Sequence, residues 1–325
     1  MPASPTPVVA AKPVATPTKT VTTIKTVYQA LGATGLPVWL AKEERLFEKY
    51  GLSAELSYIA SGTTAMQAML AGEVPILPQS AGAPAIAASV GGADAVIIGV
   101  VFNSPIFFLM VTPNIQRPED LKGKVIGTGG LGTLTDSSAR FALKKMGLEP
   151  EKDVAFVKMD AAQILAAVQS GAIAGGPMSS PNDFHAREAG FKELMDIGAA
   201  GFQYPTGAII TTRSFIRSNR ATVLNFMRAM VEGIYVFRTN RPVSVSVLGK
   251  YTKTEDKRVL ESTYDGSVGK VQKIPHPVRE GMLAAIETVA ETNPKAKGAD
   301  PETFVDRQFV RELEESGFIK QLYKE

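Results

Sequence analysis

One pattern occurs in both halves of this chain. MQAMLAGEVPILPQSAG and ILAAVQSGAIAGGPMSSP each read as an amphipathic helix, a glycine, a short apolar strand and a hydroxyl-bearing turn. In both copies the hydroxyl stands eight residues after the glycine, with Ser80 following Gly72 and Ser179 following Gly171. The repeat therefore predicts two lobes of one plan. Because open α/β sheets bind ligands at the carboxyl ends of their strands, two such edges predict a ligand cleft between the lobes.

Strands and helices alternate from Thr22 onward, and the strands, such as DAVIIGVV, are almost continuously apolar. This alternation predicts an α/β fold with mostly parallel sheets, covered by helices on both faces. Residues 37–50 are predicted as one helix. Two apolar segments, 106–112 and 206–212, are predicted as strands that cross between the lobes. The predicted division is lobe I at 22–108 and 208–325, and lobe II at 109–207.

A glycine-rich turn at residues 127–132 connects a strand around Ile126 to a helix. Thr133 and Asp136 form a capping-box pattern, so the helix is predicted to begin near Thr133. Its N-terminus could hold an anion or a polar ligand end. The glycines also fit a dinucleotide fingerprint, but the nearest acidic residue after a strand, Asp160, lies 28 residues past Gly132, whereas the fingerprint needs about 20.

Composition excludes several kinds of chemistry. The chain has 325 residues, a formal net charge of +3, two histidines and no cysteine. Cysteine-ligated metals, disulfides and thiolate catalysis are therefore excluded, and two histidines without an adjoining carboxylate cluster predict no metal site. No block of basic residues supports binding to nucleic acid. No apolar run approaches the roughly 18 residues of a membrane span.

Residues 1–21 hold five prolines among Ala, Thr and Val and carry no acidic residue. This composition predicts a disordered tether. It follows the initial Met directly, which indicates an export signal that has been removed. A natural cytoplasmic tail is the alternative.

From about residue 24 to the end, the chain resembles the type II periplasmic solute-binding proteins of ABC importers, in the nitrate/sulfonate/taurine branch that includes the NMT1/THI5-like proteins. The resemblance is carried by PVWLAKEERLFEKYGLSAEL, SGTTAMQAMLAGEV, RPEDLKGKVIGTGGLGT and FVRELEESGFIKQLY. It implies a two-lobed periplasmic-binding-protein type II fold that closes on a hinge formed by two crossing segments. It also implies a monomeric periplasmic or extracytoplasmic protein, either free or lipid-anchored through the tether, that delivers a small ligand to a membrane permease.

The resemblance and the loop positions together predict a set of ligand-binding residues. These are Thr34, Leu36, Ser61, Thr63, Thr64, Ser80, Ala81, Phe102, Asn103, Leu131, Gly132, Thr133, Thr135, Asp136, Ser179, Ser180 and Tyr204. The loops contain no Lys or Arg, so we expect hydrogen bonds from neutral groups and an apolar ligand body. The expected ligand is a sulfonate or carboxylate with a hydrophobic or aromatic part, and no cofactor is expected.

Several of these residues also have a purely structural interpretation. Ser61, Thr64, Thr133 and Asp136 could serve only as helix caps, and Trp39 fits a core position better than a ligand platform. Three other functions stay open. The first two are binding of a thiamin pyrimidine precursor and enzymatic synthesis of it; the enzyme is disfavoured because cysteine is absent and the first lobe has no histidine. The third is an effector-sensing domain, which would need an attached helix-turn-helix.

Overall fold

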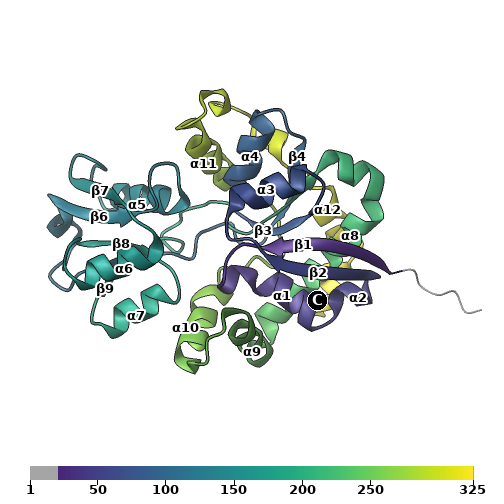
Figure 1. Cartoon of the computed structure of the whole chain (residues 1–325), viewed down its shortest axis with the longest axis horizontal. Coiled ribbons are helices and arrows are strands. Elements are labelled where there is room, and N and C mark those ends of the chain that lie inside the picture. Colours follow the sequence, from purple (N-terminus) through teal and green to yellow (C-terminus); the bar gives the residue numbers. More distant parts are fainter. Residues whose placement is uncertain (1–20, 325) are drawn as a thin grey trace, which may run out of the picture.

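The computed structural model describes residues 21–324, so the predicted tether lies almost wholly outside the described residues. The elements form two groups joined by thin connections (Figure 1). Ten strands contribute to the sheets of the described region: β1 (Thr22–Tyr28), β2 (Leu52–Tyr58), β3 (Leu77–Ser80), β4 (Ala95–Val100), β5 (Phe108–Val111), β6 (Lys124–Thr128), β7 (Val154–Lys158), β8 (Gly175–Met178), β9 (Lys192–Asp196) and β10 (Ala208–Thr212).

The α-helices between and after these strands are α1 (Leu36–Glu43), α2 (Leu46–Lys49), α3 (Gly62–Leu70), α4 (Gly82–Val90), α5 (Leu134–Lys145), α6 (Ala161–Gln169), α7 (Asn182–Glu188), α8 (Arg213–Thr239), α9 (Arg241–Thr252), α10 (Lys257–Val268), α11 (Arg279–Ala290), α12 (Gln308–Glu315) and α13 (Phe318–Tyr323). Short 3-10 turns are η1 (Ala33–Gly35), η2 (Pro118–Leu121), η3 (Pro294–Ala296) and η4 (Pro301–Phe304).

Each group of elements contains one mixed sheet. In lobe I the β1-β2 pair joins the β3-β10-β4 sheet through a parallel bridge between Thr26 and Ile76. In lobe II the order is β7-β6-β8-β5-β9. Strand β10 runs antiparallel to β3 and β4, and β5 runs antiparallel to β8 and β9. The predicted α/β fold with mostly parallel sheets is therefore confirmed. The antiparallel strand of each lobe, β10 or β5, is the first strand that the chain forms after it passes from the other lobe.

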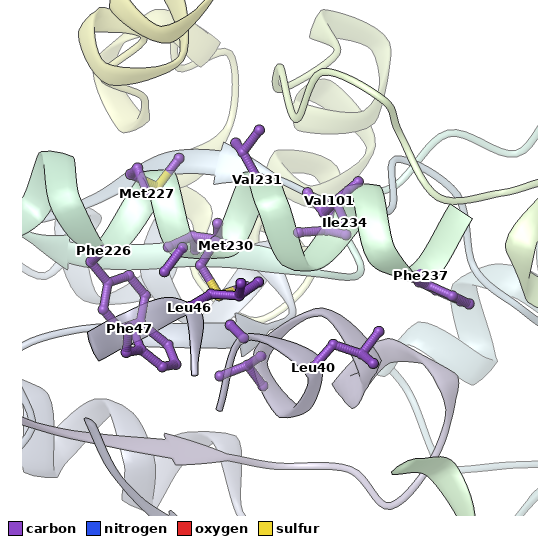
Figure 2. Close-up of a cluster of buried hydrophobic side chains, with 14 of the residues drawn as sticks. Leu40, Leu46, Phe47, Val101, Phe226, Met227, Met230, Val231, Ile234 and Phe237 are labelled. Atoms are coloured by element: carbon purple, nitrogen blue, oxygen red, sulfur yellow. The ribbon is translucent and has the colours of Figure 1, made fainter. Parts of the chain in front are cut away.

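The lobe I sheet buries both faces. Along β4, Val96 and Ile98 point to one core while Ile97 points to the other, as the two-residue period of a strand requires. Helix α8 crosses α1 and α2 on the first face and places Phe226, Met230 and their neighbours against Leu40 and Phe47 (Figure 2). Burial of each such side chain contributes about 1.5–3 kcal/mol. This core makes lobe I a rigid base for its loops.

One glycine lets α8 approach α1 closely. A Cβ on Gly233 would lie 2.3 Å from the carbonyl oxygen of Pro37. Any side chain at this position would push the two helices apart and disrupt the core beside the sheet.

The crossing segments differ from the prediction. Strands β5 and β10 each lie within one sheet, so neither spans the lobes. The chain crosses at residues 101–107 and 197–207, which run side by side. Hydrogen bonds join them from Tyr204 N to Asn103 O (2.8 Å), from Thr206 N to Phe102 O (2.9 Å) and from Ile197 N to Phe107 O (3.0 Å). The expectation of two crossing strands is therefore wrong, and a hydrogen-bonded pair of irregular segments connects the lobes.

One local prediction also needs correction. The single helix expected over 37–50 is interrupted at Arg45, whose left-handed backbone (φ 54°) separates α1 from α2. Strand β3 includes Gln79 and Ser80. Of the possible caps Ser61 and Thr64, Ser61 is the N-cap of α3.

Candidate functional site

Three neighbouring cavities lie between the lobes. The central cavity (about 290 Å³) is lined by the ends of β1 and β3, by the loop before η1, by both crossing segments and by Ser179. The cavity on the α10 side (about 320 Å³) shares Ala30, Thr34 and Ser179 with it. The cavity on the α11 side (about 600 Å³) shares Ala81 with it. Because both lobes contribute lining residues, a ligand in these cavities would contact both lobes.

A chain of hydrogen bonds forms the lobe I wall of the central cavity. The side chain of Gln79, at the end of β3, donates to Thr34 Oγ1 (2.6 Å) and accepts from the backbone N–H of Gln29 (3.2 Å). Ser80 donates to Gln29 Oε1 at 3.4 Å. The Nε2 amide of Gln29 is buried and has no hydrogen-bond partner. Since a buried unpaired donor is unfavourable, this N–H group is a candidate to donate to a ligand.

The helix N-termini around the cleft differ in how far they are already capped. Ser61 accepts from Thr64 N (3.2 Å) and Thr133 accepts from Asp136 N (3.3 Å), so α3 and α5 are capped by side chains. Helix α4 has Ala81 as N-cap and therefore no side-chain cap. Ala81 lines both the central and the α11-side cavities. Gly82 N already donates to Pro205 O (2.8 Å), and Pro84 has no N–H. An oxyanion at the start of α4 would therefore accept from the Ala83 N–H.

The glycine loop after β6 is held by its own hydroxyl groups. Thr135 Oγ1 accepts from Gly129 N at 2.8 Å, and Thr133 Oγ1 donates to Gly130 O at 2.7 Å. Gly130 (φ 99°) and Gly132 (φ 75°) have left-handed backbones that favour glycine. The loop thus presents Gly132 and Thr133 to the α11-side cavity, with Thr133 serving as the predicted N-cap.

The cavities bring together about half of the predicted ligand-binding residues. Those that line a cavity are Thr34, Thr63, Ser80, Ala81, Gly132, Thr133, Ser179, Ser180 and Tyr204. Burial raises the pKa of Tyr204 to about 12, so its hydroxyl is neutral at physiological pH.

The other predicted residues lie elsewhere. Leu36 and Phe102 are fully buried in the lobe I core, as is Trp39. Asn103 donates to His276 O (2.8 Å) and accepts from Val278 N (3.1 Å), so it fixes a crossing segment. A further group lines none of the three cavities: Ser61, Thr64, Leu131, Thr135 and Asp136. For Leu36 and Phe102, enclosure by core side chains leaves no surface to contact a ligand.

Some lining residues were not predicted from the sequence. Gln29 is the residue after β1, and its position at a strand end could have identified it. Asp183 lines the α10-side cavity, and Thr206 lines the central one. Phe107 and Phe108 supply apolar walls to the central and α10-side cavities. Of these, only the strand-end glutamine has a clear signal in the sequence.

The comparisons with known proteins agree with this architecture. The NMT1/THI5-like family profile matches residues 34–242. A putative binding protein of Brucella abortus is 30% identical over 259 residues, which cover 75% of this chain and 76% of the relative. The chain therefore belongs to the NMT1/THI5-like family, as the resemblance predicted.

Solved structures show the same fold. The periplasmic aliphatic sulphonate binding protein SsuA from Escherichia coli matches with a TM-score of 0.73 at 22% identity, over 88% of this chain and 92% of that one. The periplasmic nitrate-binding protein NrtA from Synechocystis PCC 6803 matches with a TM-score of 0.70 at 16% identity, over 91% and 89%. The fold is that of two-lobed periplasmic binding proteins. Among the described helices, none is both long and apolar enough to cross a membrane.

Proposed function

We propose that this protein is the extracytoplasmic solute-binding component of an ABC importer. It captures a small organic anion, a sulfonate or carboxylate with an apolar part, and delivers it to a membrane permease. The observation that carries the proposal is the set of neighbouring cavities lined from both lobes, beside the two segments that connect the lobes. Binding between lobes that move on such a connection traps a ligand by closure.

The polar groups of the central cavity suit an oxyanion held by neutral donors. Ser80, Ser179 and Thr206 surround it, together with the start of α4 and the unpaired Gln29 amide. A helix N-terminus contributes about 0.3–1 kcal/mol, or about 2 kcal/mol when partly buried, whereas micromolar binding needs about 8 kcal/mol. The remainder must come from hydroxyl and amide hydrogen bonds and from apolar contact with Ile106 and Phe107.

The lining residues do not favour catalysis. Asp183 and Tyr204 are the titratable side chains among the residues that line the three cavities, and the pKa of Tyr204 is about 12. A general acid or base works best with a pKa near the working pH. Neither histidine lines any of the three cavities, and His276 contacts Glu314 (3.0 Å). We therefore infer binding without chemistry.

The proposal is tested by screening and by a matched pair of variants. A thermal-shift screen of sulfonates, aromatic carboxylates, pyrimidines and inorganic anions identifies ligands, and X-ray scattering of the saturated protein should then show a smaller radius of gyration. Ser179→Ala should weaken binding about three- to tenfold, the loss of about 1 kcal/mol for one hydrogen bond, with little change in melting temperature.

The control is Ser61→Ala, which removes a cap outside the cavities. It should lower the free energy of unfolding by about 1 kcal/mol and leave affinity unchanged. Equal affinity losses in both variants, or tight binding without compaction, would contradict the proposed cleft.

A further inference from the structure

Two helices of lobe I extend toward lobe II, one on each side of the connection between the lobes. Helix α10 lies on the same side as α7, and α11 lies on the same side as α5 (Figure 1). The chain between α10 and α11 is fixed to a crossing segment. Gln272 N donates to Val101 O (2.8 Å), and Val278 N donates to Asn103 Oδ1 (3.1 Å). The two helices therefore flank the cleft from one common base.

On the α10 side, opposite charges join the lobes. Arg258, in the first turn of α10, pairs with Glu188 of α7 (2.7 Å), and its guanidinium lies 5.8 Å from the centre of the Phe184 ring. Just after α10, Lys270 pairs with Asp196 at the end of β9 (2.8 Å), and these two side chains are only 14% and 25% exposed. Because water and salt screen a partly buried pair less than an exposed one, this second pair is the stronger of the two.

Neutral contacts lie between these two ion pairs. The hydroxyl of Thr263, in the middle of α10, contacts Ser180 Oγ of lobe II. The backbone of Gly266 passes beside the Phe108 ring, which would lie 3.7 Å from a Cβ at this position. The contact with lobe II therefore follows α10 from its first turn to the residues just after its end.

The contact on the α11 side is weaker. Ser137 Oγ of α5 and Thr288 Oγ1 of α11 lie 3.1 Å apart, and within residues 21–324 no ion pair joins α11 to lobe II. Loss of hydration raises the pKa of Glu291, directly after α11, and the Asp136 carboxylate of α5 raises it further. Two like charges from different lobes therefore repel each other here. The cavity on this side is also the larger one, at about 600 Å³ against about 320 Å³.

We propose that the cleft opens on the α11 side while α10 stays in contact with lobe II, so that a solute enters and leaves through the α11-side cavity. Lobe II then turns about its contact with α10. The ion pairs on that side keep their partners during the movement, whereas on the α11 side one hydroxyl contact is broken and two like charges separate. This inference rests on the proposed function and assigns its entrance.

The first test measures how fast a small anion reaches each side of the cleft, and the absence of native cysteine makes it specific. Thr263→Cys and Thr288→Cys are matched variants, because both threonines are buried (8% and 5% exposed) and both contact a serine of lobe II. Ser180→Cys and Ser137→Cys place the thiol on the opposing serines. The reagent is 2-sulfonatoethyl methanethiosulfonate, a thiol-reactive sulfonate, and each rate is divided by the rate of the same variant unfolded in urea.

We expect the α11-side thiol to react about ten times faster in each pair, which corresponds to a difference of about 1.4 kcal/mol in the free energy of opening. Equal rates on the two sides, or faster reaction on the α10 side, would overturn the inference. Should a threonine variant fail to fold, the serine pair decides alone. These measurements need no bound solute, so their failure leaves the proposed function standing. That function fails separately, if a tight ligand causes no compaction.

The second test loosens the α10 contact. Glu188→Gln removes the charge that pairs with Arg258, and it should raise the reaction rate of Thr263→Cys about two- to fivefold, as expected for an exposed ion pair. The rate of Thr288→Cys should stay the same. Glu312→Gln is the control, because this exposed glutamate also pairs with an arginine of another helix, but within lobe I. If Glu188→Gln changes the rate of Thr263→Cys no more than this control does, α10 does not hold its side closed and the inference is wrong.

Discussion

Helices α5 and α7 of lobe II carry the same cluster of side chains with different surroundings. In each, an aspartate of the first turn pairs with an arginine four residues later, and the arginine also pairs with a glutamate. Each guanidinium lies over a phenylalanine ring, at 4.8 Å for Phe156 and 4.5 Å for Phe108. The difference is that Asp183 has a buried oxygen without a partner and lines a cavity, whereas Asp136 does neither.

The comparison shows that the same local pairing of an aspartate with an arginine can occur in different tertiary environments. An aspartate in the first turn of a helix, paired with an arginine at i+4, stabilises a helix wherever it occurs. What differs is the tertiary position of the second carboxylate oxygen. The aspartate of the α5 cluster lines none of the three cavities, whereas the aspartate of the α7 cluster lines the α10-side cavity.

The largest effect on stability should follow from removing the arginines. Arg140→Met leaves the Asp136 carboxylate buried without its cation, so we expect the free energy of unfolding to fall by about 3 kcal/mol. Arg187→Met should reduce it by a similar amount, about 3 kcal/mol, because Asp183 is also buried and its Oδ1 atom has no other partner. Urea denaturation measures both. A loss below about 1 kcal/mol at Arg187 would show that water hydrates Asp183 once the arginine is removed.

A smaller effect is expected when each aspartate is replaced by asparagine. Asp136→Asn should reduce the free energy of unfolding by about 1–2 kcal/mol, since a charge-assisted hydrogen bond becomes a neutral one. Asp183→Asn should change it by less than about 0.5 kcal/mol, because the substitution also removes a buried, half-paired charge. Denaturation of ligand-free protein provides the measurement. Equal losses at the two positions would mean that the two aspartates are energetically equivalent.

The sequence was sufficient to predict the features that depend on neighbouring residues. Alternating apolar strands and helices predicted the α/β architecture, and Thr133 followed by Asp136 predicted the N-cap of α5. Prediction from the sequence failed where contacts between distant segments determine the local structure. The break at Arg45, the burial of Phe102 against Phe237 and the unpaired oxygen of Asp183 depend on packing across the fold. The glycine-rich motif before Asp136 predicts a ligand-binding loop, whereas no such motif precedes Asp183.

The smallest expected effect concerns Glu291, whose pKa is raised by loss of hydration and by the Asp136 carboxylate of α5. Glu291 lies beside the glycine loop, with its Oε2 atom 3.8 Å from the position of a Cβ on Gly132. Loss of hydration raises the pKa of Glu291, and the nearby Asp136 carboxylate raises it further. The folded protein therefore binds this proton more readily than the unfolded chain. The ordinary pKa of glutamate is about 4.3. The contribution of Glu291 to the free energy of unfolding is therefore lost as the pH rises from this value through the raised pKa of the folded state.

Glu291→Gln should consequently stabilise the protein at pH 7 by only about 0.3 kcal/mol, because solvent screens this exposed side chain. Below pH 4 the advantage should disappear, since a protonated glutamate and a glutamine are both neutral. In the Asp136→Asn background the gain at pH 7 should shrink, whereas in the Asp183→Asn background it should persist, because of the two aspartates only Asp136 acts on the pKa of Glu291. Melting temperatures of the single and double variants between pH 3.5 and pH 7.5 measure this coupling. A gain that is independent of pH, or that depends on Asp183 instead, would show that the α5 cluster does not govern Glu291.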